Sequence, residues 1–223
     1  MTTTPHQTSY LNAIEGLPPG RSLILNDVSW EDYEQLLDDL GDSSGNRVTY
    51  YEGRLEIVSP SSKHELYKEL ILLIGHAIGD ETGSVVESRG STTFKQKSLA
   101  KGAEPDTCFY VQNASRIIGR IKIDLIVDPP PDIAVEIDVS HRSKIKLAIY
   151  ERFGVPEVWR YDERRMRIYG LTPQGYVEST VSISFPLLTP DVLTDLLERS
   201  NTMGQSAVLR SFREWLREHA QGR

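Results

Sequence analysis

The sequence lacks the features that mark several large classes of protein. Its 223 residues include a single cysteine, Cys108, so a disulfide framework is excluded. No stretch approaches the ~18 consecutive apolar residues of a membrane-spanning helix. The N-terminus has neither the basic region nor the apolar core of a signal peptide. We therefore expect a cytoplasmic protein that does not enter a membrane.

Several kinds of site are also disfavoured. The five histidines are scattered, which argues against a zinc centre. The chain has no glycine-rich phosphate loop and no G-x-S-x-G nucleophile elbow. The formal net charge of −7 argues against a protein whose entire surface attracts nucleic acid. What is present, 39% hydrophobic and 26% charged residues, is ordinary for a globular domain with a substantial core.

The composition divides the chain into three regions. Residues 1–21 are rich in Thr, Ser, Pro and Gly and predict a loose tail. Residues 22–188 form the expected main domain, and residues 189–223 a C-terminal helical extension. The last helix has an apolar stripe that fits either the core or a homodimer contact, made by Phe212, Trp215 and Leu216.

Local patterns predict a mixed α/β order of elements. Ser29 and Gly41 bound a first helix, and a hairpin follows over 48–58. A long helix covers 62–82, capped by the segment Ser59-Pro60-Ser61-Ser62 and closed by Gly83. The next elements are short strands near 84–88 and 92–97, nearly continuous apolar strands at 105–111 and 132–139, a helix near 142–153, strands at 156–161, 165–171 and 176–180, and helices near 190–200 and 204–219.

Acidic residues embedded in the two most apolar strands point to chemistry. Glu136 and Asp138 are two residues apart, so a strand presents both on one face. Asp106, at the start of the other strand, can converge with them if the strands are neighbours. Buried carboxylates are costly without a counter-charge, and three in one site cannot all stay ionised. Mg²⁺ or Mn²⁺ would answer this, and its waters would serve hydrolysis.

Two lysines and a histidine are candidate partners of these carboxylates. Lys144 or Lys146, at the start of the next helix, could orient an attacking water or stabilise negative charge. The alternative is a surface lysine on an amphipathic helix. His64 begins the long helix, where the alternative is a solvent-exposed residue of the first turn.

Taken together, these residues resemble a known family. The motifs Glu104-Pro105-Asp106 and Val135-Glu136-Ile137-Asp138, with the helix-to-strand segment 146–162, are similar to those of the Uma-type family of endonucleases. This family is part of the restriction-endonuclease-like PD-(D/E)XK superfamily. The resemblance implies an α/β (mixed α+β) fold, in which a central mixed β-sheet is flanked by helices, with an N-terminal helix and hairpin and C-terminal helices.

The resemblance also implies roles for single residues. Asp106 matches the aspartate of the Pro-Asp motif, and Glu136 the acidic residue of the third strand. Asp138 stands where the E-x-K pattern has lysine, and Lys146 takes the place of that lysine. His64 matches a polar helix position near the pocket.

We therefore expect a Mg²⁺- or Mn²⁺-dependent DNA endonuclease. Asp106 and Glu136 would bind the metal, with the carbonyl of Ile137 as a further ligand. Asp138 would assist, and Lys146 would position water or stabilise charge. Two alternatives stay open. One is a catalytically inactive module with the same fold, which the acidic charge favours. The other is a metal-dependent phosphodiesterase for a small substrate, which a narrow pocket would indicate.

Overall fold

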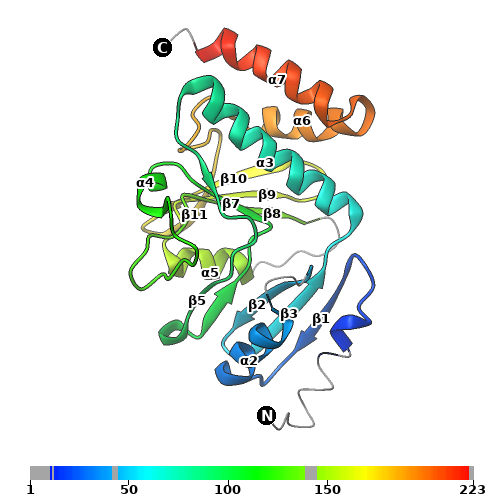
Figure 1. The fold of residues 1–223 in the computed structure, drawn as a ribbon, viewed down its shortest axis with the longest axis vertical. Helices are drawn as coiled ribbons and strands as arrows, with labels where there is room; N and C mark the ends of the chain where they lie inside the picture. The colour runs from blue at the N-terminus through cyan, green and yellow to red at the C-terminus, as the bar shows by residue number, and fades with distance from the viewer. Residues whose placement is uncertain (1–10, 12, 42–44, 139–144, 221–223) are drawn as a thin grey trace.

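A computed structural model describes residues 11, 13–41, 45–138 and 145–220, and contains two β-sheets (Figure 1). The larger sheet has the strand order β11-β10-β9-β8-β7-β4. Its strands β8 and β9 are parallel and its other pairs are antiparallel, which confirms the predicted mixed sheet. The strands are β4 (Glu87–Ser88), β7 (Thr107–Tyr110), β8 (Ile133–Ile137), β9 (Glu157–Tyr161), β10 (Met166–Thr172) and β11 (Gly175–Ser179).

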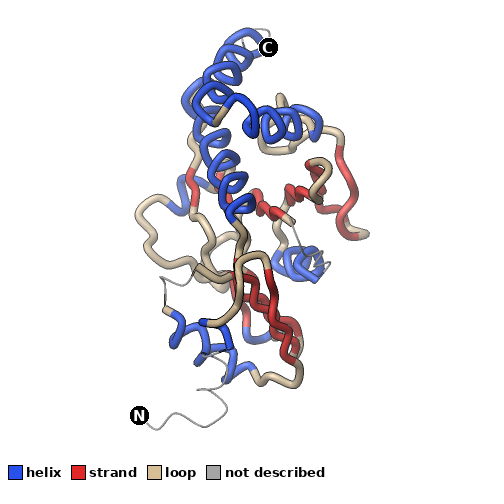
Figure 2. Tube along the Cα trace, turned by 90° about the vertical axis from the view of Figure 1, so that its right-hand side faces the viewer, coloured by secondary structure: helices blue, strands red, loops and turns tan. Residues whose placement is uncertain are grey.

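Helices flank this sheet on both faces. One face is covered by α3 (Ser62–Thr82), α6 (Pro190–Met203) and α7 (Gln205–Ala220), and the opposite face by α5 (Ile145–Phe153) (Figures 1 and 2). Phe212 and Leu216 of α7 are buried in the core, so part of its apolar stripe serves the monomer. A homodimer contact stays a prediction.

The second sheet is larger than the predicted hairpin. It is antiparallel, with the order β1-β3-β2-β6-β5, and α2 (Trp30–Leu40) packs on it. Its strands are β1 (Arg21–Leu25), β2 (Arg47–Tyr51), β3 (Arg54–Ser59), β5 (Phe94–Gln96) and β6 (Lys101–Ala103). The sequence pattern did not predict β1 and β6. Both segments are short and form strands only because they pair with strands distant in sequence, β1 with β3 and β6 with β2.

The N-terminal region contributes to this second sheet's core. Ile14 is 3% exposed and packs in the same apolar cluster as α2, so the stretch 1–21 includes a packed residue as well as positions outside the described ranges. The boundaries at 22–188 and 189–223 stay predictions.

The caps of α3 agree with the sequence. The Ser61 hydroxyl accepts a hydrogen bond from the backbone N–H of His64 at 3.3 Å, and Gly83 ends the helix with φ +71°. This capping places His64 in the first turn, beside the end of β3. Among the helices within the described ranges, α3 included, none combines the length and apolar character that crossing a bilayer requires.

Alternation along β8 assigns its residues to opposite faces. Val135 and Ile137 belong to the core beneath α3, whereas Ala134 belongs to the core beneath α5. Glu136, between Val135 and Ile137, therefore faces α5. The helix predicted near 142–153 is described from Ile145 onward, and 142–144 lie outside the described residues.

Close packing of α3 on β7 can be tested at Gly75. A Cβ added there would lie 2.5 Å from Cε1 of Phe109. We expect Gly75→Ala to destabilise the protein by about 1–3 kcal/mol through overpacking, in spite of the better helix propensity of alanine. Urea unfolding would measure this change.

The control is Gly75→Ala combined with Phe109→Leu, because leucine leaves room for the added methyl group. The double variant should lose less stability than the sum of the single variants. Strictly additive losses would show that the ring and the methyl group do not meet.

Candidate active site

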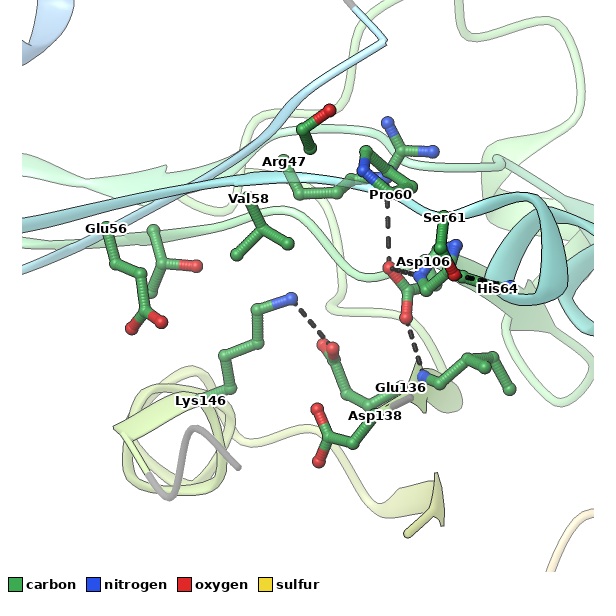
Figure 3. A pocket seen from close by; sticks show the side chains of 13 residues that line it. Arg47, Glu56, Val58, Pro60, Ser61, His64, Asp106, Glu136, Asp138 and Lys146 are labelled. Atoms are coloured by element: carbon green, nitrogen blue, oxygen red, sulfur yellow. Dashed lines mark hydrogen bonds and ion pairs between the residues drawn. The ribbon is translucent and has the colours of Figure 1, made fainter. Parts of the chain in front are cut away.

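A pocket with a volume of about 40 Å³ lies where the two sheets meet, and it gathers the predicted site residues (Figure 3). Its walls come from β2, β3, the start of α3, the segment before β7, the end of β8 and the start of α5. The lining residues are Arg47, Thr49, Glu56, Val58, Ser59, Pro60, Ser61, His64, Asp106, Glu136, Ile137, Asp138 and Lys146. Lys144 lies outside the described residues.

A buried ion pair joins Lys146 to Glu136. The Lys146 ammonium donates to Glu136 Oε2 at 2.7 Å and to the carbonyl of Glu104 at 3.0 Å. Tyr150, one turn further along α5, donates its hydroxyl to Glu136 Oε1 at 2.5 Å. Lys146 is thus not a surface lysine: it is 8% exposed, and Glu136 is 5% exposed.

The electrostatics of this pair are unusual. Burial raises the pKa of Glu136 to about 7, against the opposing effect of the Lys146 ammonium, and the Asp106 carboxylate raises it further. For Lys146, burial favours a lower pKa, but the Glu136 and Asp106 carboxylates outweigh it and hold the pKa above its usual range. A carboxyl group with a pKa near neutrality in a pocket is typical of a functional site.

The two carboxylate oxygens of Asp106 contact different elements, β8 and α3. Its Oδ2 accepts a hydrogen bond from the backbone N–H of Ile137 at 2.6 Å, and its Oδ1 lies 2.9 Å from Nε2 of His64. Burial favours a higher pKa for Asp106, but the His64 hydrogen bond and the Lys146 charge outweigh it and keep that pKa below its usual value. Burial disfavours charged His64, yet Asp106 raises the pKa of its imidazole. His64 is thus buried, with a carboxylate partner.

Asp138 has its own cation. The Arg160 guanidinium, on the adjacent strand β9, donates from Nε to Asp138 Oδ2 at 2.5 Å. Burial raises the pKa of Asp138 even though Arg160 opposes the shift. Asp138 lines the pocket together with Glu136, as the two-residue strand period predicts.

Glu56 is a pocket residue that the sequence reasoning missed. It is 7% exposed, and within the part of the chain that the structure describes its carboxylate has neither a hydrogen-bond nor an ion-pair partner. Figure 3 shows it on the side of the pocket where Lys146 enters. The available signal was a carboxylate between Leu55 and Ile57, the same signal that singled out Glu136.

Arg47 was also missed. Its side chain is buried, and its Nε lies 3.8 Å from Asp106 Oδ1 while Nη1 donates to the carbonyl of Gly45 at 3.1 Å. It stands at the start of β2 after a turn, where an arginine carries no distinctive signal. Arg47 adds positive charge to the wall of the pocket opposite Lys146.

The donor atoms of the pocket suit a hard cation. Among the described residues, no group of three or more His, Cys, Asp or Glu is arranged to hold a metal. Asp106 and Glu136 nevertheless offer two carboxylates, and Ile137 lines the same pocket. Carboxylate, carbonyl and water oxygens are the ligands that Mg²⁺ prefers, and Mg²⁺ is commonly held by only one or two carboxylates. The donor types therefore fit, with water completing the coordination.

The chain is similar to known proteins of one family. The model of the Uma2 family, described as "Putative restriction endonuclease", matches residues 30–200, which include every candidate residue from His64 to Lys146. No curated protein matches the chain. Among solved structures, a "putative nuclease belonging to DUF820" from Anabaena variabilis is 20% identical, with a TM-score of 0.49 over 67% of this chain and 90% of that chain. Because the family model spans well over half of the chain, the protein belongs to the Uma2 family of restriction-endonuclease-like proteins.

Proposed function

We propose that the protein is a Mg²⁺- or Mn²⁺-dependent endonuclease that hydrolyses phosphodiester bonds of DNA. Family membership supports the nuclease class. The observation that carries the proposal is the convergence of Asp106, Glu136 and Lys146 in one pocket. Lys146 lies 2.7 Å from Glu136, and Asp106 is bonded at 2.6 Å to the backbone N–H of Ile137, the next residue of the strand.

In this proposal Asp106 and Glu136 hold the cation, with the carbonyl of Ile137 as a further ligand. The cation would supply positive charge for the phosphoryl oxygens and a more acidic water. The pocket volume of about 40 Å³ is enough for an ion with a few waters.

The chain's own residues would perform the remaining tasks. Lys146 donates two of its three ammonium protons within the protein, which leaves one for a phosphate oxygen. His64 keeps Asp106 ionised, and Arg160 holds Asp138 at the edge of the pocket. Glu56, without a partner among the described residues, is the candidate to accept the proton of the attacking water.

The size of the pocket disfavours the small-substrate alternative. Pockets that enclose a small-molecule ligand have volumes of about 300 Å³ or more. The pocket around Glu136 has about 40 Å³, so a nucleoside bound there would have to extend out of it into the larger hollow beside Arg47. A polymer that presents only its backbone phosphate to the pocket meets this restriction.

A non-catalytic module is the second candidate function, and one observation favours it. Asp106, Glu136 and Asp138 each already have a basic partner, namely His64, Lys146 and Arg160. These three carboxylates therefore have basic partners without a metal ion. Cation binding must compete with these internal partners, which makes metal affinity the deciding measurement.

The first test is cleavage. Glu136→Ala should lower Mg²⁺-dependent nicking of supercoiled plasmid by about 100-fold or more, because it removes a ligand and the partner of Lys146. Glu218→Ala, at an exposed glutamate of α7, is the matched control and should nick at the wild-type rate. Circular dichroism would verify folding. Wild-type nicking by a folded Glu136→Ala variant would refute the assignment.

The second test is metal binding. Calorimetric titration with Mg²⁺ or Mn²⁺ should give saturable binding that Asp106→Asn weakens by roughly tenfold or more, since a neutral amide is a poorer ligand for a hard cation. Asp191→Asn, at an exposed aspartate of α6, should bind like wild type. Absence of binding, or binding that Asp106→Asn leaves intact, would favour the non-catalytic module.

The third test concerns Glu56. Glu56→Gln keeps the side-chain shape and removes the carboxylate, which lies in the open pocket, so we expect the free energy of unfolding in urea to change by less than about 0.5 kcal/mol. Nicking should fall in the same variant by about 100-fold, because the amide cannot accept the proton of the attacking water. The exposed control Glu218→Gln should change neither quantity. A less stable Glu56→Gln variant would mean that this carboxylate has a structural role.

A further inference from the structure

A second, larger hollow adjoins the active-site pocket at Arg47. Its volume is about 530 Å³, and its walls come from the end of α2, the start of β2, the segment 89–95 and the loop around 121–123. Arg47 lines both this hollow, which we name the Arg47 groove, and the pocket of Glu136. A chain lying in the groove would therefore extend toward the active site.

The groove is basic, although the protein as a whole has a net charge of −7. Its lining includes the cations Arg47, Arg89, Lys95 and Lys122 and the acids Asp38 and Glu104. The Glu104 carboxylate is already engaged, since it accepts hydrogen bonds from the Val48 N–H at 2.9 Å and the Thr93 hydroxyl at 2.6 Å. A polar hollow with an excess of cations raises the local concentration of an anionic chain.

Lys122 has the fewest polar contacts of these cations with other described residues. It is exposed, and within the described ranges it has no hydrogen bond or ion pair. Lys95, by contrast, lies 2.8 Å from Glu34, and Arg89 donates to the carbonyl of Ile117 at 2.7 Å. Lys122 is thus available for a phosphate oxygen without breaking an internal contact.

The loop that carries Lys122 also exposes aliphatic side chains. This loop joins α4 (Ala114–Ile117) to β8, and its Ile121 is 97% exposed beside Lys122. The loop is an ordered one: the Asp124 N–H donates to Asp128 Oδ2 at 3.0 Å, and Arg89 ties its start to the rest of the fold. Ile118, Ile126 and Val127 of the same segment are also more than half exposed, so Ile121 belongs to a stretch of exposed aliphatic residues. Figure 1 shows this loop beside the sheet, on the side of α4.

We propose that the Arg47 groove and the loop bearing Ile121 and Lys122 bind the DNA strand that flanks the phosphodiester in the active-site pocket. The cations meet backbone phosphates, and Ile121 makes an apolar contact with the bases, as aliphatic side chains do in several DNA-binding proteins. This inference rests on the proposed function. The excess of cations along the groove favours a polyanion over a second copy of this acidic chain.

The test measures binding separately from cleavage. Fluorescence anisotropy of a labelled DNA duplex of about 20 base pairs, and of its single strand, is recorded with the full chain in EDTA at several salt concentrations. Lys122→Glu should weaken binding by roughly five- to tenfold and lower the slope of log affinity against log salt by about 1. Ile121→Ser should weaken binding without changing that slope.

Arg210→Glu is the matched control. It makes the same change of charge at an exposed residue of α7, which Figure 1 places at the opposite end of the molecule from β5 and α2. Equal affinities of Lys122→Glu and Arg210→Glu, or no DNA binding by the wild type, would overturn the inference. So would self-association of the wild type that Ile121→Ser abolishes while DNA binding stays intact, because the loop would then serve a second copy.

Nicking in Mg²⁺ distinguishes this inference from the proposed function. If the wild type nicks DNA and the Lys122→Glu variant binds and nicks equally well, the DNA-binding role of the Arg47 groove is wrong and the proposed endonuclease activity stands. If DNA binding depends on Lys122 but the wild type does not nick DNA, the DNA-binding role of the groove is supported and the proposed endonuclease activity is wrong.

Discussion

The buried ion pair between Lys146 and Glu136 is the interaction on which the rest of this site depends. Removing two charges from water is costly, and only close approach with further hydrogen bonds can offset that cost. Tyr150 and the Glu104 carbonyl supply those bonds. Lys146 and Tyr150 belong to α5, Glu136 belongs to β8, and Glu104 precedes β7. These contacts therefore require α5 to lie against β8 and against the segment before β7.

This requirement also joins the two sheets. The backbone carbonyl of Glu104 accepts a hydrogen bond from Lys146. The side-chain carboxylate of Glu104 accepts one from the backbone N–H of Val48, in the second sheet. Asp106, two residues later, binds His64 at the start of α3. The pocket therefore lies at a junction that no single element could form. Asp106, Glu136 and Asp138 already have basic partners, so a ligand of these three must either displace those partners or bind beside them.

Much of the local structure was predictable because its signals are local. Ser29, Ser61 and Gly83 mark helix ends through capping and a positive φ, and the structure has those ends. The second sheet was not predictable in the same way. Strand β1 runs Arg21–Leu25 and β6 runs Lys101–Ala103, and their short patterns become strands only when β3 and β2 supply hydrogen-bond partners.

The sequence by itself determined that Glu136 and Asp138 share one face, and that carboxylates in such apolar strands need positive partners. Both follow from the two-residue period of a strand and from the cost of burying charge. Only the tertiary structure decided the pairing: Lys146 with Glu136, His64 with Asp106 and Arg160 with Asp138. It also brought Glu56 into the pocket without a described partner. The reason is that periodicity is a property of neighbours in sequence, whereas the partner of a buried charge is set by which elements pack together.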